Sequence, residues 1–342
     1  MKGRRRGVEA SWSREVAGFS ERTERDYAMR RVSQPKVSGP AWGATPCLAA
    51  SVLANLRRIM EIETSTPPDS ALVDREVALA AWLVARERIA IGFSGGVDSA
   101  YLAVAARRVL GRDGVLAIIG RSASYPDAQW AAARDVARAF DVRILELDTS
   151  ELDDPRYAAN PSNRCYYCKT ELWGKLVPTA RVHGFSTVVD GTNADDLVDW
   201  RPGAQAAREH GIASPLAELG FTKQDIRDAS RRLGLPTWQQ PSSPCLSSRL
   251  PYGTAVTPTR LKQVERAESA LRELGIAGDL RVRYHEELAR VELGADELPR
   301  WLEPSRFETL REALVATGFA RVALDLRGFR SGSLNVLHGV VA

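Results

Sequence analysis

The amino-acid sequence predicts an α/β protein with a doubly wound parallel sheet, followed by a smaller α+β domain. Up to about residue 190, short apolar runs alternate with amphipathic segments of ten or more residues. This alternation is typical of parallel strands joined by crossover helices. After about residue 255 one long helical segment is followed by closely spaced apolar runs. With 342 residues, of which 44% are hydrophobic, the chain is long enough for two domains.

The first domain is expected over residues 69–253, after a turn-rich segment that ends in a helix-capping signal. Apolar periodicity predicts its first elements. The strands are expected at 88–93, 115–119, 142–147 and 187–190, and the helices at 71–87, 100–110 and 127–140.

The second domain is expected over residues 254–342. Its first element is a helix at 257–274, on which Glu265, Arg266 and Glu268 are expected to point outward. Three strands and a second helix complete the prediction. The strands are expected at 280–284, 289–293 and 319–326, and the helix at 304–317.

Charge is unevenly distributed along the chain. The net charge is +4, but residues 1–40 contain ten basic and five acidic residues, which leaves about −1 for the rest. The body therefore lacks the basic footprint of a duplex-binding protein, and nucleic acid is an unexpected partner. Residues 1–68 are expected to be a disordered basic extension or the result of an upstream start site. The alternative for this segment is an arm that binds nucleic acid or a membrane.

Hydropathy and cysteine content indicate the compartment. No run approaches the ~18–20 apolar residues of a membrane span, so no membrane partner is expected. Four cysteines in 342 residues do not make a disulfide framework, and no signal peptide is visible. We therefore expect a reducing cytoplasm.

A glycine turn follows the first predicted strand. It consists of Ser94, Gly95, Gly96, Val97, Asp98 and Ser99, and is called the glycine turn below. Two glycines allow close backbone approach to a ligand, and the N–H groups of a following helix favour an anion. The P-loop and dinucleotide patterns are absent, because no Lys follows the glycines and no third Gly is correctly spaced. The alternative is an ordinary strand-to-helix turn that requires glycine.

Three cysteines form a second candidate group, called the cysteine set below. Cys165 and Cys168 make a C-x-x-C motif that we expect on a loop, and Cys245 lies in the run PSSPCLSSR. Zinc would need a fourth ligand, and none of the four histidines has suggestive spacing. Three thiolates suit a 4Fe–4S cluster with one open iron that holds a labile sulfide. The alternative is a set of inert, buried cysteines.

These motifs resemble known families. The glycine turn resembles the PP-loop of N-type ATP pyrophosphatases, which belong to the adenine nucleotide alpha hydrolase-like fold. A further ordered set resembles the LarE family, over about residues 70–335 but not over the N-terminal extension. The matching runs are NPSNRCYYCK, DGTNADDL, RPG, SPL, LPTW, PSSPCLSSR and LDLRGFRSGS.

The resemblance implies an ATP-dependent sulfurtransferase of nickel-pincer nucleotide biosynthesis. Family members adenylate a carboxylate of pyridinium-3,5-biscarboxylate mononucleotide, release pyrophosphate and install sulfur, twice. Members with one cysteine, matching Cys245, sacrifice its sulfur. Members with three, matching the cysteine set, hold a 4Fe–4S cluster, so we expect the cluster subtype here. The resemblance also implies a homo-oligomer.

Site residues follow from the motifs and the resemblance. Asp98 is a candidate Mg²⁺ or pyrophosphate-side residue, with a helix cap as the alternative. Ligands of open α/β sheets bind beyond the strand ends, so loops after strands are expected to face ATP. The expected nucleotide-side residues are Ser94, Gly95, Gly96, Asp98, Ser99, Ser124, Gly191, Thr192 and Asn193.

The substrate carries a phosphate and carboxylates, which arginine binds well. Arg281 and Arg283 alternate on one predicted strand and so share a face. The expected substrate-side residues are Asp195, Arg249, Arg281, Arg283 and Arg330. Surface ion pairs are the alternative for each arginine.

Three other functions remain open. A PP-loop tRNA thiolase would need a basic docking surface, which only the N-terminal extension offers. An amidating PP-loop enzyme would have no role for C-x-x-C. A non-catalytic, metal-stabilised adenine-nucleotide sensor would use the cysteine set only for stability.

Overall fold

The computed structural model of the protein describes residues 69–197, 202–241 and 244–330. The extension expected over residues 1–68 and the last part of the second domain, residues 331–342, lie outside the described residues. No helix in the described ranges is both long and apolar enough to cross a membrane.

The first sheet has four parallel strands, as predicted. These are β1 (Ile89–Gly92), β2 (Val115–Arg121), β3 (Ile144–Asp148) and β4 (Thr187–Val189). Their order is β3-β2-β1-β4, so the chain runs outward from β1 to β3 and then crosses back to the other side of β1. The carboxyl ends of β1 and β4 therefore form the topological switch point, where open α/β sheets bind ligands.

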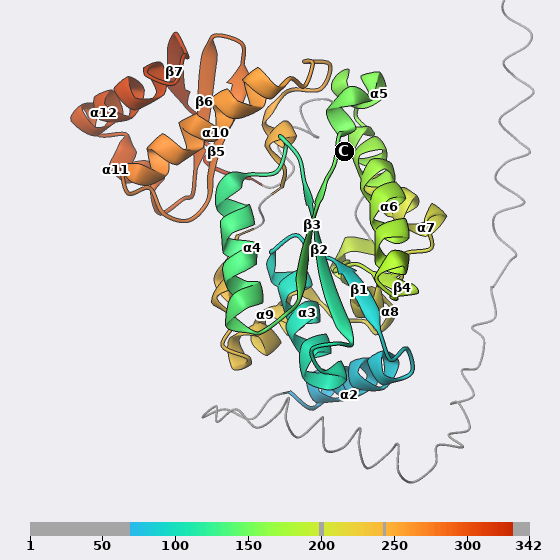
Figure 1. Cartoon of the computed structure of the whole chain (residues 1–342). Helices are drawn as coiled ribbons and strands as arrows, with labels where there is room; N and C mark the ends of the chain where they lie inside the picture. The colour runs from blue at the N-terminus through green and yellow to red at the C-terminus, as the bar shows by residue number, and fades with distance from the viewer. Residues whose placement is uncertain (1–68, 198–201, 242–243, 331–342) are drawn as a thin grey trace, which may run out of the picture. The chain divides into compact units, whose positions relative to one another are not determined.

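Helices cover both faces of this sheet (Figure 1). One face packs on α2 (Ser70–Val84), α3 (Val97–Leu110) and α4 (Asp127–Ala139), and the other on α6 (Arg164–Val182). Alternate strand residues separate into the two cores. Ile89 and Ile91 join the core under α3, whereas Ala90 between them joins the core under α6.

Shorter elements complete the first half. They are η1 (Glu151–Asp153), α5 (Pro155–Ala158), η2 (Asp195–Leu197), α7 (Pro202–Glu209), α8 (Pro215–Glu218), α9 (Lys223–Arg232), η3 (Pro236–Gln239) and η4 (Leu246–Arg249). Helix α9 begins with a capping box, in which Thr222 and Asp225 each accept the other's backbone N–H.

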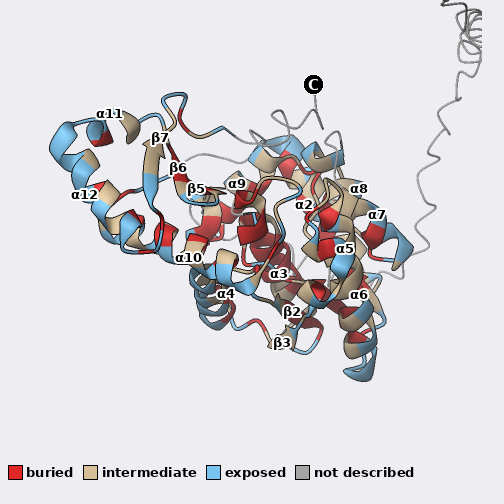
Figure 2. Ribbon diagram, turned by 90° about the horizontal axis from the view of Figure 1, so that it is seen from above, coloured by how far each residue is buried: buried red, intermediate tan, exposed pale blue. Residues whose placement is uncertain are grey.

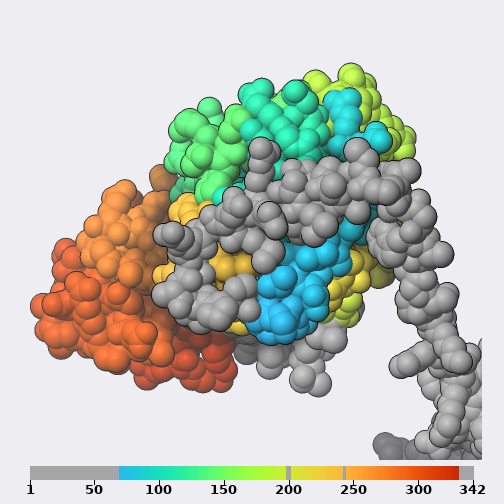
Figure 3. All heavy atoms as spheres, turned by 90° about the horizontal axis from the view of Figure 1, so that it is seen from below, coloured from blue at the N-terminus to red at the C-terminus, as the bar shows by residue number. Residues whose placement is uncertain are grey.

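The second part of the chain forms a mixed three-stranded sheet with three helices. It comprises α10 (Pro258–Glu273), β5 (Leu280–His285), β6 (Leu288–Leu293), α11 (Leu298–Trp301), α12 (Pro304–Val315) and β7 (Arg321–Leu324). Strands β5 and β6 are antiparallel, and β7 is parallel to β6. Its residues gather in one block, orange to red in Figure 3. Buried residues gather on the strands and on α3, and exposed residues on outer helices such as α4 and α12 (Figure 2).

Two expectations about local structure are wrong. The C-x-x-C motif lies not on a loop but in the first turns of α6, because Asn163 ends the Pro- and Asn-rich segment as the N-cap of that helix. Glu268 does not point outward from α10. Its carboxylate pairs with the buried guanidinium of Arg249. This ion pair holds Glu268 toward the protein interior, whereas the helix pattern predicted a solvent-exposed side chain.

Candidate functional site

The glycine turn joins β1 to α3 at the switch point. Its Gly95 has φ +68°, and a Cβ there would lie 2.5 Å from the Cβ of Ala133 on α4, so only glycine fits. Hydrogen bonds close the turn on itself. The N–H of Ser94 donates to Oγ of Ser99 at 3.2 Å, and that hydroxyl donates to the carbonyl of Gly96 at 3.2 Å.

The start of α3 is open to an anion. The helix spans 14 residues, and its N-cap, Gly96, provides no side-chain hydrogen bond to the first turn. The early N–H groups of a helix have no intrahelical acceptor, and the helix dipole adds positive potential there. The turn therefore has the geometry of a phosphate cradle.

A lysine completes the cradle from a distant part of the chain. Nζ of Lys223, the first residue of α9, lies 2.5 Å from Oδ2 of Asp98. Asn193 donates to the other oxygen of Asp98 at 3.2 Å. The sequence analysis missed Lys223, because the two residues of this ion pair are 125 positions apart. The only local signal was its place at the start of a well-capped helix.

The segment after β4 packs directly on the glycine turn. A Cβ on Gly191 would lie 2.8 Å from the backbone nitrogen of Ser99, so glycine allows the two loops to meet. Thr192 and Ser214 both hydrogen-bond the carboxylate of Asp190, which fixes this segment. The structure thus brings the predicted residues Gly191, Thr192 and Asn193 to the predicted loop.

Asp195 has a structural partner in the same corner. Its carboxylate accepts the backbone N–H of Lys223 at 2.8 Å. The residue therefore helps to hold the start of α9, and with it the lysine, beside the glycine turn. Asp195 lies on the nucleotide side of the site as well as in the predicted substrate set.

Ser124 links the nucleotide side to the cysteine set. Its hydroxyl donates to the buried carboxylate of Glu151 at 2.7 Å. Its backbone carbonyl accepts the N–H of Leu246 at 2.8 Å, one residue after Cys245. The loop after β2 therefore holds the cysteine-bearing segment directly.

The cysteine set comes together from two elements. Cys165 is exposed in the first turn of α6, while Cys168 and Cys245 are half-buried. Cys165 and Cys245 are electrostatic neighbours of Cys168. Burial, and then the Glu151 carboxylate, raise the pKa of the Cys168 thiol well above its ordinary value. The sequence pattern did not identify Glu151.

Tyr157 also lies at this set and was not predicted. Its hydroxyl is 2.6 Å from Oγ of Ser247, and its ring is buried. Burial, with Cys245 and Cys168 nearby, raises the pKa of this phenol far above its usual range. Tyr157 therefore stays protonated and presents a neutral hydroxyl beside the thiols.

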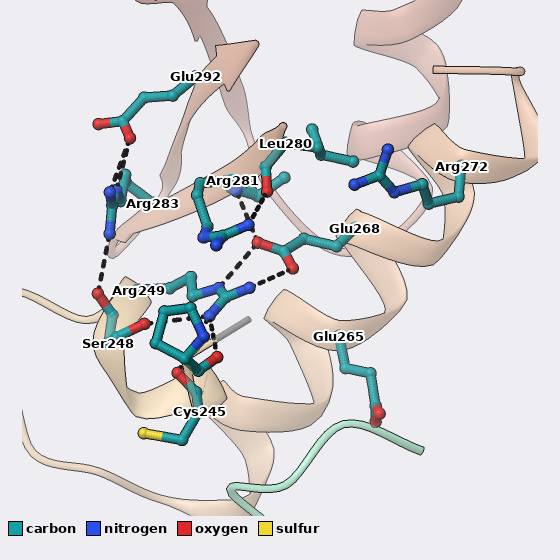
Figure 4. A network of polar contacts seen from close by, with 12 residues as sticks. Cys245, Ser248, Arg249, Glu265, Glu268, Arg272, Leu280, Arg281, Arg283 and Glu292 are labelled. Carbon is teal, nitrogen blue, oxygen red and sulfur yellow. Dashed lines mark hydrogen bonds and ion pairs between the residues drawn. The ribbon is translucent and has the colours of Figure 1, made fainter. Parts of the chain in front are cut away.

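Three predicted arginines form one buried network with Glu268 and Glu292, called the arginine network below (Figure 4). Arg249 binds Glu268 through two nitrogens, each at 2.9 Å, and Arg283 binds Glu292 in the same way at 3.0 and 2.7 Å. Arg281 donates to the carbonyl of Leu280 at 2.6 Å. Burial and the neighbouring Arg249 lower the pKa of Arg281 to about 10.

The arginine network is bonded to the Cys245 segment. Arg249 donates to the carbonyls of Pro244 and Cys245 at 2.5 and 3.1 Å, while the Sγ of Cys245 points away from the guanidinium (Figure 4). Arg283 donates to the carbonyl of Ser248 at 3.0 Å. Arg330 is exposed after β7, and its neighbour Phe329 lies under the guanidinium of Arg281 at 5.0 Å.

The chain is similar in sequence to known proteins. Residues 83–160 match the NAD synthase family. The chain is 44% identical over 249 residues to an uncharacterized protein of Synechocystis, covering 73% of this chain and 92% of the relative. It is 35% identical over 266 residues to the pyridinium-3,5-bisthiocarboxylic acid mononucleotide synthase of Lactiplantibacillus plantarum, a LarE protein, covering 78% and 95%. The chain belongs to the LarE family. An uncharacterized protein of Methanocaldococcus jannaschii is 27% identical over 249 residues, covering 72% and 92%.

As a LarE-family member with a PP-loop domain, the protein is an ATP-using sulfurtransferase. PP-loop proteins usually bind ATP with Mg²⁺. Within the described ranges, no group of three His, Cys, Asp or Glu side chains surrounds a possible ion position. Asp98 offers a partly exposed carboxylate at the glycine turn. Its two oxygens are bonded to Lys223 and Asn193, so a Mg²⁺ ion held here would take most of its oxygen ligands from phosphates and water, as Mg²⁺ commonly does.

The cysteine set of this LarE-family chain is the second candidate ligand group. The donors are soft thiols, which suit iron–sulfur chemistry, and in the described part of the chain they do not converge on one ion. A cluster is larger than an ion and takes each thiolate on a different iron. The thiol chemistry of the three donors is therefore compatible with a cluster that has three protein ligands.

Proposed function

We propose that this enzyme uses ATP to activate carboxylates of pyridinium-3,5-biscarboxylic acid mononucleotide and replaces an oxygen of each by sulfur, for nickel-pincer nucleotide synthesis. The name of the L. plantarum relative, a pyridinium-3,5-bisthiocarboxylic acid mononucleotide synthase, supports the product class. The observation that carries the proposal is the bond between Leu246 N–H and Ser124 carbonyl. This bond holds the segment that carries Cys245, the proposed nucleophile, at the loop after β2, on the edge of the sheet where we propose that phosphates bind.

The reaction needs both a phosphate-binding site and a sulfur nucleophile. A carboxylate oxygen attacks the α-phosphorus of ATP, and pyrophosphate leaves. The resulting acyl adenylate has AMP as a leaving group, so a sulfur nucleophile can attack the acyl carbon and release AMP with the original oxygen. Water must be excluded, because hydrolysis of the adenylate would waste ATP.

On the nucleotide side, the N–H groups of the glycine turn and Lys223 bind the pyrophosphate part of ATP. Asp98 orients Lys223 and provides an oxygen for Mg²⁺, which balances the phosphate charge when bound. The expected nucleotide-side residues are Ser94, Gly95, Gly96, Asp98, Ser99, Ser124, Gly191, Thr192 and Asn193. Their common place at the ends of β1, β2 and β4 supports this assignment.

On the sulfur side, we propose that Cys165, Cys168 and Cys245 hold a 4Fe–4S cluster. When bound, such a cluster would supply an iron without a protein ligand, which could hold a sulfide for transfer. Helix α6 orients two of the thiols, and the bond from Leu246 to Ser124 orients the third. The buried ring of Tyr157 keeps water from the side of the thiols that it covers.

The arginine network serves the anionic substrate in this proposal. Arg249, Arg281 and Arg283 give three guanidinium groups against two carboxylates, Glu268 and Glu292. The excess positive charge beside Cys245 favours a ligand with a phosphate and carboxylates. Asp195 and Arg330 are the remaining substrate-side candidates. The family resemblance also predicts a homo-oligomer, which light scattering tests.

Metal analysis of the anaerobically purified protein tests the sulfur side. We expect about four irons and at least four acid-labile sulfides per chain. Cys165→Ala, Cys168→Ala and Cys245→Ala should each lose them, together with multi-turnover thiocarboxylate formation. Adenylation, followed as exchange of labelled pyrophosphate into ATP, should survive in all three.

Cys47→Ala is the matched control, because no motif places Cys47 in the cysteine set, and it should keep its iron. A cysteine-set variant that still makes many thiocarboxylates per chain would contradict the cluster proposal. Loss of sulfur from Cys245 in a chain without iron, seen by mass spectrometry, would instead indicate a sacrificial cysteine.

A further inference from the structure

One backbone carbonyl in the glycine turn accepts two side-chain hydrogen bonds. The hydroxyl of Tyr125 and Nε2 of Gln129 both donate to the carbonyl oxygen of Ser94, each at 2.8 Å. We propose that Tyr125 and Gln129 are positioning residues for ATP, which fix the Ser94–Gly95 peptide so that its N–H faces the phosphates. This inference rests on the proposed function, because it concerns the same nucleotide site.

The two hydrogen bonds from Tyr125 and Gln129 to the Ser94 carbonyl are called the clamp below. The geometry of the peptide bond explains how the clamp orients the N–H of Gly95. The described chain has no cis peptide bond, so the carbonyl of Ser94 and the N–H of Gly95 point in opposite directions. Holding the carbonyl toward α4 directs the N–H of Gly95 away from α4. That N–H has no hydrogen-bond partner among the described residues. It is therefore available to a phosphate together with the early N–H groups of α3.

The clamp opposes rotation of the Ser94–Gly95 peptide. A glycine with positive φ can exchange between turn conformations by rotation of the preceding peptide, because it has no Cβ to oppose the change. Such a rotation at Gly95 would turn the carbonyl of Ser94 toward the phosphates and repel them. Two donors on one carbonyl, which has two lone pairs, oppose the rotation.

Helix α4 holds both donors in place. Tyr125 immediately precedes its N-cap, Pro126, and Gln129 lies in its first turn. Ala133, one turn beyond Gln129, is the residue that a Cβ on Gly95 would strike. One face of α4 therefore sets both the distance and the orientation of the glycine turn. Burial also raises the pKa of Tyr125, so its hydroxyl remains a donor at neutral pH.

Tyr125 also borders a cavity of about 400 Å³ beyond the ends of β2 and β3. Trp130 and Thr149 are among the other lining residues. A nucleotide that occupies this cavity would contact the same tyrosine that holds the Ser94 carbonyl.

The test compares ligands with and without a pyrophosphate group. Dissociation constants for Mg-ATP, pyrophosphate and AMP are measured by calorimetry on the full chain, for Tyr125→Phe, Gln129→Leu and the double variant. Each single variant should weaken ATP and pyrophosphate about fivefold, the typical net worth of one hydrogen bond. The double variant should weaken them by more than tenfold, and AMP should bind within about twofold of wild type.

Gln205→Leu is the matched control, because the amide of Gln205 donates to Glu209 on the exposed face of α7 and should leave all three constants unchanged. Gln129→Glu keeps the side-chain shape but places an acceptor against the carbonyl, and should weaken ATP more than Gln129→Leu. If the double variant does not fold, the dissociation constants of the single variants test the proposal.

Unchanged ATP affinity in the variants, or equal weakening of ATP and AMP, would overturn the clamp. Wild-type protein that fails to bind ATP at all would instead overturn the proposed function.

Discussion

Lys223 sets the charge balance of the glycine turn. Without it, Asp98 would direct an uncompensated carboxylate at the bound phosphates, so removal of the lysine both deletes an attraction and exposes a repulsion. The pair is partly solvent-exposed, with side-chain exposures of 35% and 22%, which allows the lysine to exchange the carboxylate for a phosphate.

Lys223→Met should therefore reduce adenylation strongly. Loss of a charge-assisted hydrogen bond typically corresponds to about 1.5–3 kcal/mol, or roughly a 10- to 100-fold rise in the KM for ATP. Pyrophosphate exchange into ATP measures this step without any sulfur chemistry. Lys223→Arg should retain part of the activity. Lys262→Met, which removes an exposed lysine paired with Asp127 and Glu265, is the control and should behave as wild type.

The two cysteines of the C-x-x-C motif should differ in reactivity. Cys165 is exposed, whereas burial and then Glu151 raise the pKa of Cys168 well above its ordinary 9.0. Only thiolates react with iodoacetamide, so at pH 8 the metal-free protein should be alkylated at Cys165 at least about tenfold faster than at Cys168. Peptide mass spectrometry over time measures both rates. Equal rates would contradict the burial of Cys168.

The same pKa shift predicts how stability depends on pH. The unfolded chain loses the Cys168 proton near pH 9, while the folded chain keeps it, so the unfolded state binds fewer protons above that pH. The free energy of unfolding of the metal-free protein should therefore fall as pH rises above about 9. Cys168→Ala should make this fall shallower in urea titrations at pH 8 and 10.

At the scale of single elements, local sequence patterns predicted the strands of the first sheet and the helices α3 and α4, but not α6. Each of the four strands of the first sheet lies within about two residues of its expected range, because buried parallel strands are continuous apolar runs. Helix α6 was missed, since Pro161, Asn160 and Asn163 resemble a loop and Pro178 interrupts its pattern.

The site itself was predictable where its residues are consecutive. The glycine turn and the segment 190–193 could be found from strand ends and glycine spacing. Lys223, Glu151 and the Tyr125–Gln129 clamp could not, because they reach the site through tertiary contacts. Arg249 was among the predicted substrate-side residues, but its pairing with Glu268 was not predictable, because neither position alone indicates a bidentate pair.

The contact between the β4 loop and α3 gives a prediction at this scale. Gly191→Ala places a Cβ 2.8 Å from the backbone nitrogen of Ser99, and backbone cannot move aside as a flexible side chain can. We expect a loss of about 1–3 kcal/mol of stability and at least tenfold weaker ATP binding.

Gly174→Ala in α6 is the matched control for this substitution. Its nearest neighbour, Cε1 of His210, would lie 3.9 Å away, and alanine favours a helix, so stability should stay equal or rise. Equal behaviour of the two alanine variants in urea unfolding would contradict the close contact.

At the scale of the whole molecule, the hydrophobic core of the second part includes Tyr157 of the first part, and polar contacts also link the two parts. Residues 246–256 contribute Leu246, Leu250 and Val256 to the core of the second part, although Leu246 is hydrogen-bonded to the loop after β2. The Arg249–Glu268 pair fixes this crossing segment to α10. The position of Cys245 therefore depends on both parts.

Breaking this pair should be costly. Glu268→Ala leaves the guanidinium of Arg249, which is 2% exposed, without its carboxylate, and should reduce the free energy of unfolding by about 3–5 kcal/mol. The double substitution Arg249→Met with Glu268→Leu should cost less, because no unpaired charge remains. Urea unfolding measures both. A smaller loss in the single variant would contradict the buried ion pair.

The separation of Asp98 and Lys223 has a consequence for protein synthesis. A ribosome adds about 5–20 residues per second, so the 125 positions between them take roughly 6–25 s to translate. During that interval β2, β3 and β4 are synthesised, and the glycine turn is present without the lysine. Chains that are released before α9 is complete should thus not be stabilised by ATP in the cell. Nucleotide binding should begin only after translation has passed residue 223.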